Sequence, residues 1–283
     1  MTLSERNTFF KIGIFFCAAV VLLVLAVSFF IIPIYSQGTE HDLSLDENAR
    51  RPDYFFKVIT GFILGNNYYA VHISLVLAAL YSLIGLCLIH SFFERTPTPE
   101  ILFISIFTIS LSFEFIRFFL PLNLLLNFPS IYLRISARVL LFARFFGIFS
   151  LFTAGLAAAG LDVQKTRNSI FIITIAALVI IGSVPIDVHS WDTGFNMIIG
   201  NKNMFRMIEI LIFITTIISF FIAAKIRDSK EYVYAAVGVM LALIGRTILL
   251  GTDNWIGTTQ GILFLSYGTY HICSKVHKIH LWL

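Results

Sequence analysis

Apolar residues in this chain fall into runs about as long as a bilayer is thick, and short polar segments separate these runs. A helix needs about 20 mostly apolar residues to cross the hydrocarbon core of a membrane. The pattern predicts eight spanning helices within one transmembrane domain, residues 1–283. Their predicted ranges are 9–35, 69–93, 101–123, 131–160, 169–186, 205–225, 232–252 and 255–274.

The composition supports the same fold class. The chain has 283 residues, of which 58% are hydrophobic and 13% charged, and its mean hydropathy is +0.89. Soluble domains carry about 25% charged residues. We therefore predict an all-α, polytopic integral membrane helical bundle whose first partner is the lipid bilayer. The net charge of +4 forms no basic patch with interleaved aromatics, so nothing favours nucleic-acid binding.

Two connecting segments are long enough to carry structure of their own. Residues 54–65 are apolar but too short to span, which is typical of an interfacial helix on the outer face. Residues 187–204 mix polar and apolar positions and are compatible with a loop that dips back toward the bundle.

The distribution of Lys and Arg predicts the orientation. Cytoplasmic loops carry an excess of these residues. The excess places both termini in the cytoplasm and is typical of a multi-pass protein of a bacterial inner membrane. The predicted cytoplasmic segments are 1–8, 94–100, 161–168, 226–231 and 275–283.

Charged residues within the apolar runs are the strongest functional signal. A charge at the centre of a bilayer costs at least about 2.5 kcal/mol, so these side chains should face the bundle interior and find partners. Counting along each helix places five of them at the centre and in the outer half of the membrane: Glu114, Arg117, Arg144, Glu209 and Arg246. Four more are expected at the outer rim: Arg134, Arg138, Arg206 and Asp253.

These charges allow two interpretations. The first is a set of salt bridges that hold helices together, since Glu114 with Arg117, and Arg206 with Glu209, have the i, i+3 spacing of helical neighbours. The second is an outward-facing cavity for a small anionic or zwitterionic ligand. Three deep arginines against two glutamates leave one positive charge, and the planar guanidinium suits carboxylate or phosphate.

Other chemistry has little support in the sequence. The three cysteines form no CxxC pair, and no two histidines can be matched at mid-membrane, so we expect no metal and no cofactor. A weak echo between the two halves of the chain suggests a repeat of four plus four helices, but chance recurrence of apolar helices explains it as well.

Three functions are compatible with this pattern. The first is a non-enzymatic membrane sensor or accessory subunit that responds to a ligand or to a membrane or cytoplasmic protein partner. The second is a transporter or channel for a small anionic solute. The third is an intramembrane enzyme, for which Ser112, Ser136, Ser150 and Tyr132 are candidates by proximity to the charges alone.

Overall fold

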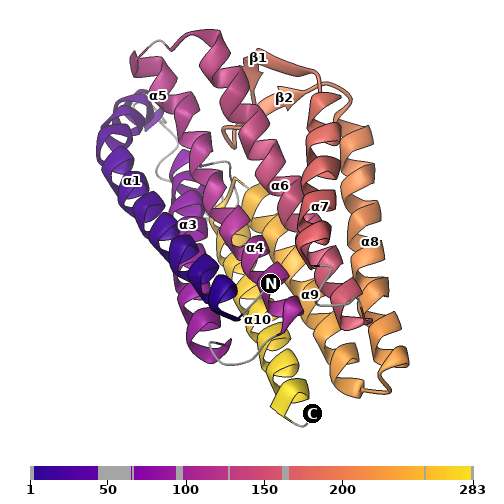
Figure 1. The fold of residues 1–283 in the computed structure, drawn as a ribbon. Coiled ribbons are helices and arrows are strands. Elements are labelled where there is room, and N and C mark those ends of the chain that lie inside the picture. The colour runs from indigo at the N-terminus through magenta and orange to yellow at the C-terminus, as the bar shows by residue number, and fades with distance from the viewer. Residues whose placement is uncertain are drawn as a thin grey trace, which may run out of the picture.

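The computed structural model describes residues 3–43, 65, 67–93, 98–126, 128–160, 166–251 and 253–281. It is an all-α bundle with one small hairpin (Figure 1). The helices are α1 (Leu3–Leu43), α3 (Tyr68–Phe93), α4 (Pro99–Ser112), the 3₁₀ segment η1 (Phe113–Phe118), α5 (Phe119–Leu126), α6 (Ser130–Ala158), α7 (Thr166–Gly182), α8 (Lys202–Ile226), α9 (Lys230–Gly251) and α10 (Trp255–Leu281). Strands β1 (Ile186–Trp191) and β2 (Met197–Ile199) pair antiparallel.

Within the described residues, six helical segments are long and apolar enough to cross a membrane. They are Ser4–Ile31, Tyr68–Phe93, Pro99–Asn123, Ser130–Ala158, Lys202–Ile226 and Lys230–Gly251. These correspond to six of the eight predicted spans. The helix predicted at 169–186 is shorter and ends at Gly182, and α10 does not belong to the six. The count of eight therefore stays a prediction.

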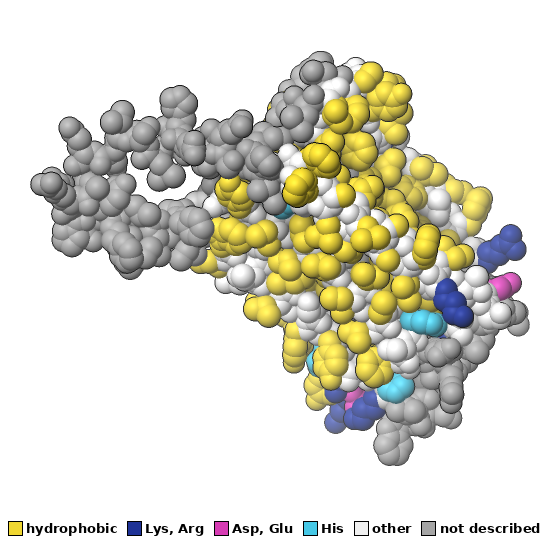
Figure 2. Space-filling view, turned by 90° about the vertical axis from the view of Figure 1, so that its left-hand side faces the viewer, with side chains coloured by type: hydrophobic (Ala, Val, Ile, Leu, Met, Phe, Trp, Pro, Cys, Tyr) yellow, Lys and Arg dark blue, Asp and Glu magenta, His cyan; other side chains and the backbone are white. Residues whose placement is uncertain are grey.

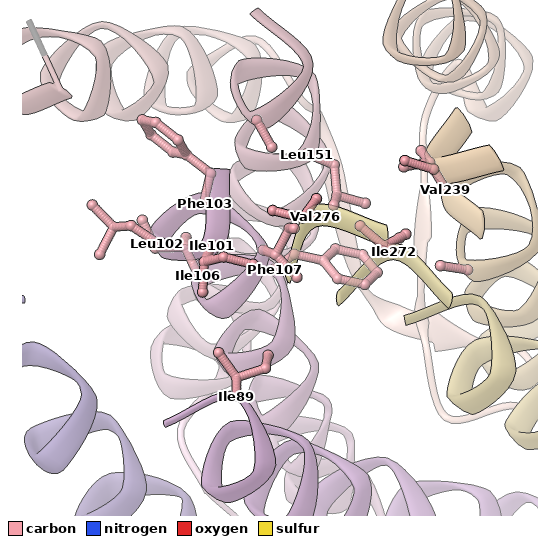
Figure 3. Close-up of a cluster of buried hydrophobic side chains, with 14 of the residues drawn as sticks. Ile89, Ile101, Leu102, Phe103, Ile106, Phe107, Leu151, Val239, Ile272 and Val276 are labelled. Atoms are coloured by element: carbon pink, nitrogen blue, oxygen red, sulfur yellow. The ribbon is translucent and has the colours of Figure 1, made fainter. Parts of the chain in front are cut away.

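The helices form a closed ring. Neighbouring pairs run α3–α4, α4–α6, α6–α8, α8–α9, α9–α10 and α10–α3, while α1 packs outside α3 and α7 packs outside α6. Aliphatic and aromatic side chains from α3, α4, α6, α9 and α10 fill the ring (Figure 3). The outside is also largely apolar on the face seen in Figure 2, as expected of a surface that meets lipid.

The beginning of α1 and the end of α10 lie at the same end of the bundle. Arg6 donates a hydrogen bond of 2.6 Å to the carbonyl of Phe93, the last residue of α3. The Phe93 ring lies 5.3 Å from that of His277. Which side of a membrane this end faces stays a prediction from the Lys and Arg distribution.

The segment predicted as one helix over 101–123 changes its winding in the middle of the span. Residues Phe113–Phe118 form a 3₁₀ turn between α4 and α5. Pro121 lies in α5, where its ring excludes the ordinary hydrogen bond to the carbonyl four residues earlier, that of Arg117. The tighter winding places Glu114 and Arg117 inside the bundle, where both are buried.

The two connecting segments have different outcomes. The interfacial helix predicted at 54–65 lies outside the described residues, except for its last residue, Gly65, which forms a bend. The segment 187–204 contains most of the β1–β2 hairpin and the first turn of α8. Its tip, residues 192–196, reaches the buried charges, so the sequence correctly suggested that it turns back toward the bundle.

Candidate functional site

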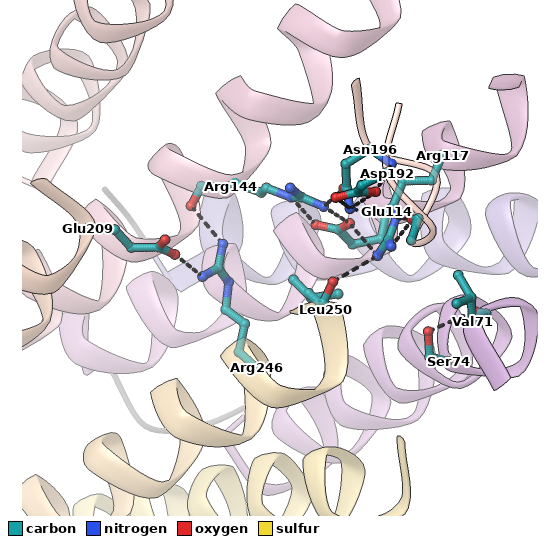
Figure 4. A network of polar contacts seen from close by, with 11 residues as sticks. Val71, Ser74, Glu114, Arg117, Arg144, Asp192, Asn196, Glu209, Arg246 and Leu250 are labelled. Atoms are coloured by element: carbon teal, nitrogen blue, oxygen red, sulfur yellow. Dashed lines mark hydrogen bonds and ion pairs between the residues drawn. The ribbon is translucent and has the colours of Figure 1, made fainter. Parts of the chain in front are cut away.

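Glu114 lies at the centre of a network of buried charges (Figure 4). Arg144 of α6 donates to both of its carboxylate oxygens, from Nε to Oε1 at 2.7 Å and from Nη2 to Oε2 at 2.6 Å. Arg117 lies one turn further along η1, with Nη1 3.8 Å from Oε2. The Glu114 side chain is only 1% exposed. One buried carboxylate therefore balances two guanidinium groups, of which Arg117 is buried and Arg144 is partly exposed, mainly through the pair between helices.

Arg117 fixes the tip of the hairpin to the bundle. Its Nε donates to the carbonyl of Gly194 at 2.7 Å, and its Nη2 donates to the same oxygen. Its Nη1 donates to the carbonyl of Leu250, near the end of α9, at 3.3 Å. A single buried side chain thus links η1, the hairpin and α9.

Arg144 contacts the hairpin as well. Its Nη2 donates to Asn196 Oδ1 at 2.8 Å. Asn196 is itself oriented by Asp192, which accepts from the Asn196 backbone N–H at 2.8 Å and from Nδ2 at 3.1 Å. The amide of Asn196 therefore connects the carboxylate of Asp192 to the Arg144–Glu114 pair.

The remaining tip residues attach the hairpin to other elements. Thr193 donates to the Asp253 carboxylate just before α10. Phe195 is buried and stacks on Tyr68 of α3, with ring centroids 6.1 Å apart. The backbone of Phe195 has a φ of 57°, a conformation that a bulky residue rarely adopts. The packing and hydrogen bonds of the tip hold this unfavourable conformation in place.

A second ion pair extends the network to α8 and α9. Arg246 Nη1 donates to Glu209 Oε1 at 2.8 Å, and Nη2 lies 3.5 Å from the carbonyl of Arg144. The Arg246 side chain is 3% exposed, whereas that of Glu209 is 33% exposed. The guanidinium is thus inside the ring, and the carboxylate lies at its edge.

The charge balance of the site differs from the one expected from the helices alone. The hairpin brings Asp192, and the start of α10 brings Asp253, close enough to attract the Arg117 guanidinium. The three arginines pair with Glu114 and Glu209, and Asp192 and Asp253 lie close enough to offset the remaining positive charge. The surplus of one positive charge counted from the deep helix positions is therefore offset by Asp253, which was expected at the rim, and by Asp192, which the helix positions could not reveal.

The structure brings together all five residues predicted as the buried network: Glu114, Arg117, Arg144, Glu209 and Arg246. Of the predicted rim, Asp253 joins the hairpin, while Arg134, Arg138 and Arg206 are exposed on their helices. The i, i+3 pairing of Arg206 with Glu209 is wrong, because Glu209 faces Arg246 instead.

Sequence reasoning missed the hairpin contribution. Asp192, Gly194 and Asn196 lie in an irregular segment where no periodicity indicates direction. The stretch 192–196 is rich in the turn-forming residues Asp, Thr, Gly and Asn, and this composition could have indicated the tip.

A smaller charged contact lies at the opposite end of the bundle and was also missed. Glu100, in the first turn of α4, is 1% exposed and lies 4.0 Å from Arg227. The Tyr232 hydroxyl donates to Glu100 Oε1 at 3.5 Å. Arg227 also approaches the carbonyl of Ala157 at 3.5 Å, so these contacts join α4, α6 and the turn between α8 and α9.

The residues considered for metal binding or nucleophilic chemistry have the following surroundings in the described part of the chain. Among the described residues, no group of three or more His, Cys, Asp or Glu side chains is placed to hold a metal ion. The hydroxyls of Ser112, Ser136 and Ser150 donate to backbone carbonyls one turn earlier in their own helices. Tyr132 is exposed on α6.

Comparison with protein-family models, with curated proteins and with solved structures finds no match to this chain.

Proposed function

We propose that this multi-pass membrane protein is a non-enzymatic sensor or accessory subunit in which the β1–β2 hairpin is the input element. The observation that carries the proposal is the double hydrogen bond from the buried Arg117 side chain to the Gly194 carbonyl. A connecting segment is thereby held by the same charges that join the helices.

The chemistry of this contact favours two discrete states over gradual loosening. If the tip leaves, Arg117 loses the Gly194 carbonyl and Arg144 loses Asn196 while both stay close to Glu114. A buried guanidinium without its acceptors is costly, so the helices would have to rearrange or admit water. Such a switch between two packed arrangements is what a sensor needs.

The network also provides a route from the hairpin to the helices. Arg144 is on α6, and its backbone carbonyl faces Arg246 of α9, which in turn pairs with Glu209 of α8. Displacing the tip would therefore alter contacts among α6, α8 and α9 together. With the predicted orientation, the hairpin would report events outside the cell to the cytoplasmic end.

The stimulus is best sought on the outer surface of the hairpin. Trp191 and Ile198 are exposed there, and apolar side chains at such a position suit an apolar part of a ligand or of a partner protein. A small anion is a weaker candidate than the helix charges alone suggested, because the guanidinium groups already face four carboxylates.

A transporter is the second candidate, and the 3₁₀ segment favours it. Transporters often bind solutes where a spanning helix is interrupted near mid-membrane. Here the interruption, Phe113–Phe118, carries Glu114 and Arg117. In this alternative the hairpin would be a gate above the site. An enzyme is the third choice, because the hydroxyls of Ser112, Ser136 and Ser150 are engaged in hydrogen bonds to their own helices.

The test displaces the tip without removing a charge. A Cβ at Gly194 would lie 2.7 Å from Arg117 Nη2 and 3.1 Å from Asn196 Nδ2, so Gly194→Ala should push the tip away from both arginines. Gly182→Ala is the matched control, since a Cβ there meets nothing within 4 Å. Hydrogen–deuterium exchange of the full chain in lipid nanodiscs would compare both variants with the parent.

If the protein is a sensor, Gly194→Ala should show faster hydrogen–deuterium exchange than the parent in the hairpin and also in α6 and α9. Gly182→Ala should exchange like the parent. Faster exchange confined to residues 186–199 would contradict the proposed coupling. Solute flux through proteoliposomes that rises in Gly194→Ala would favour the transporter instead.

A further inference from the structure

The outward face of α8 is a continuous apolar stripe that ends in a lysine. Leu211, Ile214, Ile218 and Ile222 are all exposed, at the three- and four-residue spacing of one helix face. Lys225 follows on the same face and is exposed. A lysine at the end of a lipid-facing stripe lies at the level of phospholipid headgroups.

The outward face of α9 also combines an exposed lysine with an apolar stripe, but here the lysine comes first along the chain. Lys230 is exposed in the first turn, and Tyr234, Val237, Met240 and Ile244 continue one exposed face along the helix. Helices α8 and α9 pack side by side and are joined by the short turn at 227–229 (Figure 1). The two stripes therefore reach the same end of the bundle, each with its lysine.

The other basic side chains next to the α8–α9 turn have partners. Arg227 faces Glu100 and the Tyr232 ring, and Glu231 pairs with Lys278 at 2.6 Å and Lys275 at 3.1 Å. In the described part of the chain, no carboxylate lies within ion-pair distance of Lys225 or Lys230. Around the α8–α9 turn, five basic residues outnumber three acidic ones by two; they are Lys225, Arg227, Lys230, Lys275 and Lys278 against Glu100, Asp228 and Glu231.

We propose that the end of the α8–α9 pair binds an anionic phospholipid, with Lys225 and Lys230 on its headgroup phosphate and its acyl chains along the two exposed apolar stripes. Charge complementarity selects an anionic headgroup over a zwitterionic one. The apolar stripes select a phospholipid over a soluble phosphate. The Tyr234 ring, with Lys275 Nζ 4.7 Å from its centroid, lies at the boundary between the two regions. This inference is independent of the proposed sensor role.

The test measures lipid binding by the purified full chain in detergent. Native mass spectrometry would titrate phosphatidylglycerol and phosphatidylcholine against the parent, Lys225→Ala, Lys230→Ala and the double variant. Lys202→Ala is the matched control, because Lys202 is an exposed lysine at the opposite end of α8. Glycerol phosphate tests whether the headgroup alone suffices.

The parent should bind phosphatidylglycerol more tightly than phosphatidylcholine. One cation near a membrane surface is worth about fivefold in affinity, so each single variant should lose roughly that preference and the double variant roughly 25-fold. Lys202→Ala should match the parent. Equal binding of both lipids by the parent, or unchanged preference in the double variant, would overturn the proposal. Competition by glycerol phosphate at the concentration of the lipid would overturn the role of the apolar stripes.

Discussion

Glu114 and Arg144 face each other across the interface between η1 and α6 through two N–H···O bonds of 2.7 and 2.6 Å. The planar guanidinium matches both oxygens of the carboxylate at once, which a lysine cannot do. The pair therefore requires an arginine at position 144, and it sets the position of α6 relative to the interrupted span.

We expect Glu114→Gln alone to destabilise the protein more than the double change Glu114→Gln with Arg144→Met. The single change leaves Arg144 and Arg117 without their buried carboxylate, which typically costs roughly 3–5 kcal/mol. The double change also removes the Arg144 charge, so that only Arg117 is left without its carboxylate. Thermal unfolding of the purified variants in one detergent measures the difference, and additive losses would contradict the coupling.

A second glutamate with two cationic partners provides the contrast. Glu231 contacts Lys275 and Lys278 at the end of the bundle, where the Lys278 side chain is 54% exposed. Water screens such pairs, and they contribute less than about 1 kcal/mol. Glu231→Gln should therefore lower the melting temperature far less than Glu114→Gln. A comparable loss in the same assay would show that exposure does not determine the strength of these pairs.

Glu209 and Arg246 predict an asymmetric response, because the arginine is buried and the carboxylate is one-third exposed. Glu209→Ala leaves a guanidinium inside the ring without its counter-charge. Arg246→Met removes that charge and keeps an unbranched side chain of similar length. The alanine variant should be the less stable of the two by differential scanning fluorimetry. The reverse order would indicate that Arg246 contributes mainly through its contact with the Arg144 carbonyl.

Glycines set the distance between α9 and α10. A Cβ at Gly268 would lie 2.5 Å from the backbone nitrogen of Ala242, and one at Gly245 would lie 2.8 Å from the carbonyl of Gly261. Both contacts are with backbone, which cannot rotate away, so Gly245→Ala or Gly268→Ala should cost at least about 1–3 kcal/mol. Gly251→Ala, at the end of α9, is the control, since its Cβ would meet nothing within 4 Å. Equal stability of the three variants would contradict this close packing.

Much of this architecture could be predicted from the sequence because lipid imposes a simple rule on helix length and on buried charge. That rule identified six spans that the structure supports and the five members of the network. It could not assign Glu209 to Arg246 over Arg206, because partners on different helices have no fixed spacing in sequence. It also could not foresee Asn196 or Asp192, which belong to a connecting segment without periodicity.

The spacing of glycines in the last two helices is a further signal in the sequence. Gly238 and Gly245 are seven residues apart, as are Gly261 and Gly268, a spacing that keeps small residues on one helix face. The heptad spacing would have predicted α9 and α10 as a closely packed antiparallel pair.

The close contact between α9 and α10 has a consequence for how the chain enters its membrane. Helix α10 does not belong to the six segments that qualify for crossing on their own apolar character. Its glycines nevertheless bring its backbone against that of α9, which does qualify. We therefore expect the translocation machinery to release the two together, as a preassembled helical hairpin, with the earlier segment carrying its less apolar neighbour into the lipid.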